Sequence, residues 1–186
     1  MRQARAGLSN EEFNRRAREI DWLLLDVDGV LTDGGLYYDR RGHALLKFDV
    51  RDGFAIQLAQ KAGIKTGLLS GRSPRALKRR AAELGLDAVI VGSADKAADF
   101  ERFLEREATE PKRVAYAGDD LHDLRVLGRC SLSFAPADAV AEVRAVVDSV
   151  LSKPGGAGAV RELVETILRA RGDWERVLEP FTFENR

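Results

Sequence analysis

The chain has 186 residues, and its 30 basic and 30 acidic side chains give a formal net charge of zero at pH 7. This length favours one domain over residues 1–186, with its core at about 20–171, and the balanced charge argues against nucleic-acid or membrane partners. The single cysteine cannot form an intramolecular disulfide, and the polar N-terminus is unlike a signal peptide. No apolar run approaches the roughly 20 residues of a membrane span. We therefore expect a cytoplasmic protein.

The first predicted elements are a short helix over residues 9–19 and a buried strand. Ser9 with Glu12 three residues later is the pattern of a capping box, which starts a helix. The apolar run from Trp22 to Leu25 predicts the strand, because a central parallel strand is buried on both faces.

Two aspartates, Asp26 and Asp28, follow this strand directly. Open α/β proteins bind their ligands at the carboxyl ends of the strands, so this pair is expected at a ligand site. One carboxylate can attack a phosphorus atom, and the other can exchange a proton with the leaving oxygen and then with water. Aspartates also start turns and bind metals structurally, so the pair alone leaves both interpretations open.

Residues 35–48 predict a β-hairpin inserted after this first strand. Two short apolar segments flank the polar turn Arg40–His43. Leu36, Tyr37 and Tyr38 give the hairpin an apolar face. That face is expected to pack either against another copy of the chain or onto its own domain.

Short apolar runs and amphipathic stretches alternate along the rest of the chain. This alternation predicts βαβ units and an α/β fold with a Rossmann-like, doubly wound parallel sheet. The predicted helices are a segment with apolar positions 54, 55, 58, 59 and 62 closed by Gly63, a segment from the N-cap Ser73 to Gly85, and a segment whose apolar stripe runs from Val160 to Leu168.

Three further apolar runs also end in polar side chains. Ser70 ends the second run, Lys96 follows the third, and Asp119 and Asp120 follow the fourth. The carboxyl ends of parallel strands meet at one edge, so these groups are expected beside Asp26. A serine there usually forms a turn and a lysine is usually solvated, but their order between two aspartate pairs favours a hydroxyl donor and a counter-charge for phosphate.

Together these residues resemble a known superfamily. In chain order, Asp26-x-Asp28-Gly29, Ser70, Lys96 and Gly118-Asp119-Asp120 are similar to the four motifs of the haloacid dehalogenase (HAD) superfamily of phosphotransferases. The segments 48–53, 69–72, 116–121, 135–139 and 155–162 resemble a capless branch that contains the 3-deoxy-D-manno-octulosonate 8-phosphate (KDO 8-phosphate) phosphatases. The resemblance covers about residues 20–170. It implies an α/β fold with a hairpin and no large cap domain, and Mg²⁺-dependent hydrolysis of KDO 8-phosphate to KDO and phosphate, in lipopolysaccharide precursor synthesis.

The resemblance also implies a role for each acidic motif residue. Asp26 is expected to be the nucleophile that forms an aspartyl-phosphate, and Asp28 to act as general acid and then as general base. Mg²⁺ prefers oxygen ligands, and the carboxylates of Asp26 and Asp119 with the backbone carbonyl of Asp28 are expected to hold it. Asp120 is expected to act behind them, through water or by orienting Lys96.

The phosphate and the sugar acid need further contacts. Ser70 and Lys96 are expected to hold the non-bridging phosphate oxygens, and arginine suits the carboxylate of a sugar acid. The substrate-binding residues that the resemblance implies are Asp28, Asp49, Val50, Arg51, Asp52, Gly53, Arg72, Arg80 and Lys96. Gln57 and Ala157 stand where the family pattern has arginine. This departure leaves a related nonulosonate or a broader range of sugar phosphates open as substrate.

Assembly and the chain ends follow from the same resemblance. The capless relatives assemble as tetramers, which implies a homotetramer whose hairpins pack against neighbouring subunits. The C-terminal tail, residues 172–186, carries three aromatic side chains and is expected either to dock on its own subunit or to reach a neighbour's active site. Asp123 is expected to cap or brace its loop, and His122 to take no part in catalysis.

Three other functions are alternatives to this one. An N-acylneuraminate 9-phosphate phosphatase or a broad sugar-phosphate phosphatase remains an alternative of the same class. A receiver-like signalling domain is disfavoured, because it would carry its acidic pair first and its phosphoacceptor aspartate at mid-chain, whereas here Gly-Asp-Asp comes last. A catalytically inactive scaffold is disfavoured by the complete set of motifs.

Overall fold

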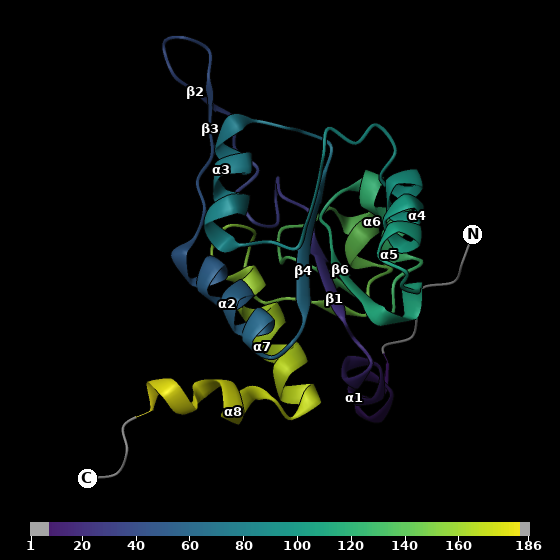
Figure 1. Cartoon of the computed structure of the whole chain (residues 1–186). Coiled ribbons are helices and arrows are strands. Elements are labelled where there is room, and N and C mark those ends of the chain that lie inside the picture. The colour runs from purple at the N-terminus through teal and green to yellow at the C-terminus, as the bar shows by residue number, and fades with distance from the viewer. Residues whose placement is uncertain (1–7, 183–186) are drawn as a thin grey trace.

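A parallel β-sheet forms the centre of the computed structural model, which describes residues 8–182 (Figure 1). Within these residues the sheet has six strands in the order β5-β4-β1-β6-β7-β8, and every neighbouring pair is parallel. The strands are β1 Trp22–Leu25, β4 Lys65–Ser70, β5 Ala88–Val91, β6 Val114–Ala117, β7 Leu132–Ala135 and β8 Ser149–Val150. The chain winds from β1 to one side and then returns to the other, which confirms the doubly wound prediction.

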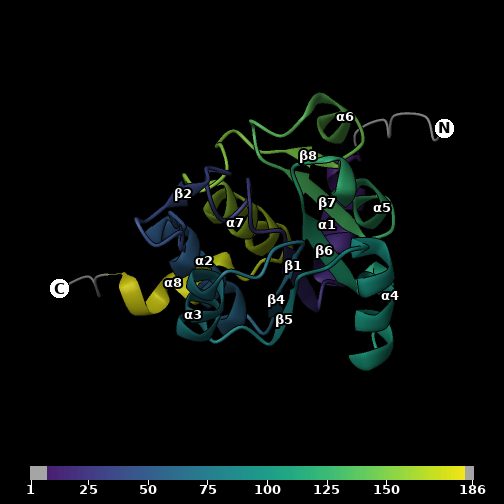
Figure 2. The same ribbon diagram turned by 90° about the horizontal axis from the view of Figure 1, so that it is seen from above.

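Helices cover both faces of the sheet (Figure 2). One layer contains α1 Asn10–Arg18, α2 Val50–Lys61, α3 Arg75–Leu84, α7 Ala159–Arg171 and α8 Trp174–Leu178, and the other contains α4 Lys96–Arg106, α5 Leu124–Leu127 and α6 Ala141–Arg144. Leu23 and Leu25 of β1 pack into the first layer, whereas Trp22 and Leu24 pack into the second. This two-sided burial explains the unbroken apolar run of β1.

Two of the helix predictions need correction. Ser9 does cap α1, since its side chain accepts the N–H of Glu12 at 3.2 Å. However, α3 begins at Arg75 with Pro74 as its N-cap in an extended conformation, one residue later than predicted from Ser73. In α2 the apolar face is turned toward Ile56, which is buried, and Phe54 is 37% exposed. The helix packs against both α7 and β4, so a wider face is buried than the predicted stripe.

The predicted hairpin projects from the body of the molecule (Figure 1). Its strands β2 Tyr37–Tyr38 and β3 Ala44–Leu45 pair antiparallel and form a separate two-stranded sheet. Leu36, Tyr37, Tyr38 and Leu45 are all exposed. The alternative in which this apolar face folds onto its own domain is therefore wrong.

The described part of the C-terminal tail packs on its own chain. Trp174 of α8 is buried, and Phe181, in the short turn Glu179–Phe181, meets Phe54 edge-on with ring centroids 5.3 Å apart. Phe183 and residues 184–186 lie outside the described residues, so the expectation for the tail is tested only as far as residue 182.

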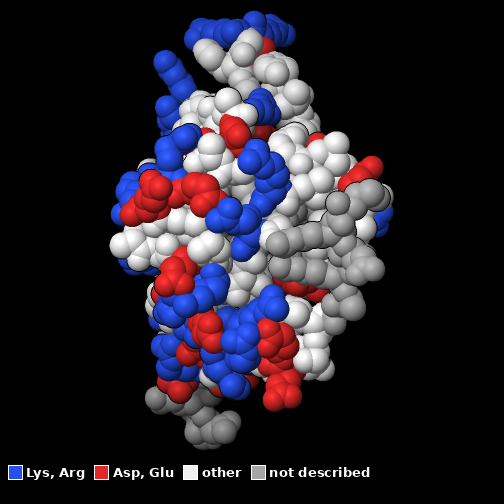
Figure 3. Space-filling view, turned by 90° about the vertical axis from the view of Figure 1, so that its right-hand side faces the viewer, with Lys and Arg blue, Asp and Glu red and all other residues white. Residues whose placement is uncertain are grey.

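The molecular surface and the helix lengths complete the description. On the face beside α4 and α5, basic and acidic side chains are intermingled (Figure 3). Within residues 8–182, we find no helix that is both long enough and apolar enough to cross a membrane.

Candidate active site

The polar residues at the strand ends meet at one edge of the sheet, beside the point where the winding reverses between β1 and β6. A cavity of about 300 Å³ opens there. Its lining residues are Asp26, Asp28, Gly29, Gly34, Leu36, Gly71, Arg72, Lys96, Asp119, Asp120 and His122. The cavity thus contains both predicted aspartate pairs and the predicted counter-charge.

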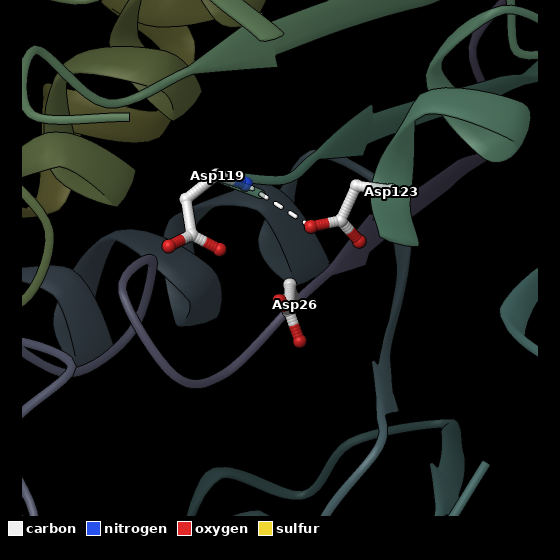
Figure 4. A group of neighbouring side chains, drawn as sticks. All are labelled: Asp26, Asp119 and Asp123. Carbon is white, nitrogen blue, oxygen red and sulfur yellow. Dashed lines mark hydrogen bonds between the residues drawn. The ribbon is translucent and has the colours of Figure 1, made fainter. Parts of the chain in front are cut away.

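Three carboxylates form the acidic centre of this site (Figure 4). Asp26, Asp119 and Asp123 each place one oxygen within 4.8 Å of the others. Burial, followed by the negative charge of Asp123, raises the pKa of Asp26 well above its ordinary value and raises the pKa of Asp119 to about 6. A nearby cation relieves this repulsion, so the cluster is suited to positive charge.

Lys96 supplies part of that positive charge. Its ammonium donates to Asp26 Oδ2 at 2.8 Å and to Asp123 Oδ1 at 2.8 Å. Burial opposes the charge on Lys96, but the attraction of the two carboxylates outweighs it and raises the pKa of the ammonium. Lys96 therefore stays charged and fixed beside the predicted nucleophile.

Asp123 holds this lysine in place. Its Oδ1 also accepts the hydroxyl of Tyr116 at 2.5 Å, and its Oδ2 accepts the backbone N–H of Asp119 at 3.1 Å and of Asp120 at 3.3 Å. Of the two roles expected for Asp120, contact with Lys96 is made by Asp123 instead, and the role through water stays a prediction. The side chain of Asp120 instead accepts the N–H of Leu121 at 2.7 Å.

The carboxylate oxygens of this centre are suitable ligands for a divalent cation. Each oxygen of Asp123 already accepts two hydrogen bonds, whereas each oxygen of Asp26 accepts one, so Asp26 and Asp119 are the better candidate ligands of the three carboxylates. Among residues 8–182, this is the group of acidic side chains that could hold a metal ion. Hard cations with oxygen ligands suit such a set.

Gly29 allows Asp119 to approach the loop after β1. Its φ is +79°, and a Cβ at this position would lie 2.0 Å from Asp119 Oδ2. Only glycine combines this left-handed conformation with so close a contact. The glycine in the Asp26-x-Asp28-Gly29 motif is therefore explained by the second aspartate pair, which lies far away in the sequence.

Asp28 lines the cavity, whereas Ser70 does not line it and directly precedes the lining residues Gly71 and Arg72. Asp28 Oδ1 accepts a hydrogen bond from Arg72 at 3.1 Å, and both residues line the cavity. Ser70 is buried at the end of β4, where its hydroxyl oxygen accepts the N–H of Arg72 at 3.2 Å. The hydroxyl hydrogen of Ser70 remains available for donation.

Six of the predicted substrate-binding residues do not line this cavity: Asp49, Val50, Arg51, Asp52, Gly53 and Arg80. Asp49 caps α2 and pairs with Arg51 at 2.7 Å. Arg51 and Ala157 line a separate cavity of about 260 Å³. Val50 is exposed, and Gln57 is also exposed on α2.

Asp52 and Gly53 have structural roles outside the cavity. Asp52 is 1% exposed, and its carboxylate accepts the backbone N–H of Gly158 at 3.2 Å and of Arg161 at 2.8 Å. This corrects the expectation for the Asp52 side chain, which holds the start of α7. A Cβ on Gly53 would lie 2.0 Å from Arg80, whose guanidinium lies over the ring of Phe48.

Sequence reasoning gave no role to Tyr116 and no part in catalysis to His122. Tyr116 stands in the buried run of β6, where a tyrosine among small apolar residues is the only local sign of a polar contact. His122 lines the cavity, but a histidine in a turn carries no sign of that position.

Comparisons with known proteins agree with this geometry. A model of the haloacid dehalogenase-like hydrolase family matches residues 41–130. The chain is 41% identical over 160 residues to 3-deoxy-D-manno-octulosonate 8-phosphate phosphatase KdsC of Haemophilus influenzae, which covers 86% of this chain and 89% of that protein. It is 40% identical over 157 residues to KdsC of Escherichia coli K12, which covers 84% of each chain.

Solved structures give the same result. The cobalt-bound phosphatase from Haemophilus influenzae superimposes with a TM-score of 0.81 at 41% identity, over 84% of this chain and 92% of that one. The Moraxella catarrhalis phosphatase in complex with magnesium, phosphate and KDO superimposes with a TM-score of 0.89 at 34% identity, over 92% of this chain and 99% of that one. The chain belongs to the haloacid dehalogenase-like hydrolases, in the family of the 3-deoxy-D-manno-octulosonate 8-phosphate phosphatases.

Proposed function

We propose that this protein hydrolyses KDO 8-phosphate to KDO and inorganic phosphate, with Mg²⁺ as its cofactor. The observation that carries the proposal is the cavity in which Lys96 pairs with Asp26 at 2.8 Å, with Asp28 and Asp119 beside them. Relatives that align over most of the chain are named for this reaction, and one solved relative contains magnesium, phosphate and KDO.

Asp26 is the proposed nucleophile. Its Oδ1 accepts the N–H of Val27 at 2.7 Å and its Oδ2 accepts Lys96, which together fix the carboxylate plane. Attack on phosphorus requires the ionised form, and burial raises the pKa of this carboxyl. The charge of Lys96 acts in the opposite direction and favours the carboxylate.

The metal ion belongs in the same oxygen-rich centre. We propose that the carboxylates of Asp26 and Asp119 and the backbone carbonyl of Asp28 bind Mg²⁺. When bound, Mg²⁺ supplies positive charge that favours the ionised carboxylates and the transferring phosphoryl group.

Asp28 and the phosphate donors complete the proposed chemistry. Asp28 gives a proton to the departing sugar oxygen and later takes one from the water that attacks the aspartyl-phosphate. Lys96 and the hydroxyl of Ser70 hold the non-bridging phosphoryl oxygens, where negative charge is concentrated. Arg72, which lines the cavity beside Asp28, is positioned to bind a polar group of the sugar acid.

We also propose a homotetramer. The hairpin leaves Leu36, Tyr37 and Tyr38 exposed, and Leu36 also lines the cavity, so a second copy packed on the hairpin would cover the active site. The double variant Leu36→Glu with Tyr38→Glu should then have both a smaller oligomeric state in sedimentation and a lower activity. A wild-type monomer with full activity would exclude this assembly. The expected cytoplasmic location stays a prediction.

The function is tested by phosphate release with Mg²⁺ from KDO 8-phosphate, N-acylneuraminate 9-phosphate and common hexose phosphates. We expect KDO 8-phosphate to have the highest kcat/KM. A higher kcat/KM for N-acylneuraminate 9-phosphate or for hexose phosphates would exclude KDO 8-phosphate as the preferred substrate, although the protein would still be a phosphatase. The variant Gln57→Arg with Ala157→Arg shows whether these positions set KM, although neither residue lines the cavity of its own subunit.

A further inference from the structure

Tyr116 is a fully buried tyrosine whose hydroxyl contacts the catalytic network. It lies on β6, two residues before Gly118, and its ring packs in the second layer of the core with Trp22 and Phe103. Its hydroxyl is 2.5 Å from Asp123 Oδ1. A carboxylate oxygen only accepts, so the tyrosine is the donor.

The acceptor atom of this hydrogen bond also binds Lys96. Asp123 Oδ1 lies 2.8 Å from Lys96 Nζ, and the same ammonium lies 2.8 Å from Asp26 Oδ2. The other oxygen of Asp123 accepts two backbone N–H groups from the loop of Asp119. One buried oxygen therefore joins β6 to α4, and the ammonium of Lys96 joins both to the loop after β1.

We propose that Tyr116 is a positioning residue for phosphoryl transfer, which holds Asp123 Oδ1 and through it the ammonium of Lys96. The proposal rests on the proposed function, in which Lys96 holds the non-bridging phosphoryl oxygens. Tyr116 itself does not line the cavity. Its effect therefore has to pass through Asp123 and Lys96.

The hydrogen bond from Tyr116 fixes the position of Asp123 Oδ1. Without the hydroxyl, Asp123 Oδ1 keeps one donor, Lys96, and attracts the ammonium more strongly, while Oδ2 stays held by the two backbone N–H groups. Lys96 would then lie closer to Asp123 and farther from Asp26 and the phosphate. The loss should therefore appear in the chemical step more than in the binding of substrate.

The competing interpretation is that the hydrogen bond only stabilises the core. Ser133 on β7 offers a matched control, because its buried hydroxyl also donates to a carboxylate, Asp148, at 2.8 Å. Neither residue lines the cavity. A purely structural bond should lower stability in both variants and leave the kinetic constants of the folded enzyme unchanged in both.

The first experiment compares Tyr116→Phe and Ser133→Ala with the wild type, with Mg²⁺, on KDO 8-phosphate and on p-nitrophenyl phosphate. We expect Tyr116→Phe to lower kcat by about tenfold with KM changed by less than about twofold, since a misplaced group costs rate more than affinity. Ser133→Ala should keep the wild-type kcat. Equal kcat values for the folded fractions of all three proteins would overturn the proposal.

The second experiment tests whether the effect passes through Lys96. In a Lys96→Met background, the further change Tyr116→Phe should lower the residual rate by less than about twofold, because the two groups act as one unit. A full tenfold loss in that background would show that Tyr116 acts by another route, and would overturn the proposal.

The third measurement uses the folded wild type and needs no turnover. With ¹³C at Cζ of the 3 tyrosines in the chain, inorganic phosphate and Mg²⁺ should shift the resonance of buried Tyr116 and leave those of exposed Tyr37 and Tyr38 in place. An unmoved Tyr116 resonance at saturating phosphate would overturn the proposal, even if Tyr116→Phe fails to fold. Failure of the proposed substrate is distinguishable, because it appears as wild-type enzyme that cleaves p-nitrophenyl phosphate and not KDO 8-phosphate.

Discussion

Substitution of Gly29 by alanine should separate backbone strain from damage to the metal site. Gly29 and Gly63 both have φ values in the left-handed region, +79° and +86°. An alanine costs about 1–2 kcal/mol of stability in that conformation. A Cβ at Gly63 meets nothing within 4 Å, whereas a Cβ at Gly29 would lie 2.0 Å from Asp119 Oδ2. The two variants share the strain and differ in the contact.

The size of the second effect follows from this distance. Real Cβ contacts stay above 3.0 Å, so the new Cβ and Asp119 Oδ2 have to move apart by about 1 Å. Mg²⁺ tolerates little departure from bonds of about 2.0–2.1 Å, so this movement should break the proposed bond to Asp119. Loss of support for a metal ligand typically costs about 10–100-fold in affinity or activity, and we expect at least this range for Gly29→Ala.

Urea unfolding and the dependence of phosphate release on Mg²⁺ concentration measure the two effects. Gly63→Ala should lose stability and keep the wild-type half-saturating Mg²⁺ concentration. Gly29→Ala should lose similar stability and need at least about tenfold more Mg²⁺. If both variants show the same Mg²⁺ dependence, the close contact between Gly29 and Asp119 does not shape the metal site.

Three other changes test separate parts of the structure. Asp26→Asn should abolish phosphate release while circular dichroism shows an intact fold, because an amide cannot attack phosphorus, and metal-dependent turnover above a trace would remove Asp26 from this role. The pKa of Asp119 is raised from 3.8 to about 6, so between these pH values the native state holds a proton that the unfolded state has lost. The metal-free protein should therefore lose stability as pH rises through this window, and Asp119→Asn should reduce the dependence of the melting temperature on pH there. Asp52→Ala leaves the N–H groups of Gly158, the N-cap of α7, and of Arg161 without this acceptor and should cost about 1–3 kcal/mol in urea unfolding, and an unchanged midpoint would contradict the assigned contact.

The sequence was sufficient for the doubly wound parallel sheet and for the position of the acidic centre. Each strand that carries a catalytic candidate is a short apolar run with a polar end, and parallel strands bring such ends together whatever lies between them. Asp26, Lys96 and Asp119 could therefore be placed beside one another before their distances were known. The start of α1 at Ser9 was predictable because capping is local chemistry.

Contacts between distant segments were beyond that reasoning. Lys96 and Asp123 are 27 residues apart, and nothing in either local pattern pairs them. The side chain of Asp52 was expected at the substrate, but it meets α7 more than 100 positions later. Phe54 looked like a core residue of α2, yet the tail covers its ring through Phe181, a contact set by how α8 leaves α7. Tertiary packing decided each of these cases.

The loop after β1 depends on a segment from the far end of the chain. A Cβ on Gly155 would lie 1.9 Å from the carbonyl oxygen of Gly29, and the N–H of Gly156 donates to the carbonyl of Val30 at 3.0 Å. During synthesis, every proposed catalytic side chain emerges before this support does. We expect a nascent chain of residues 1–150 to carry all of these side chains and to be inactive. The order of translation would thus delay phosphatase activity until the glycine pair can close against the loop.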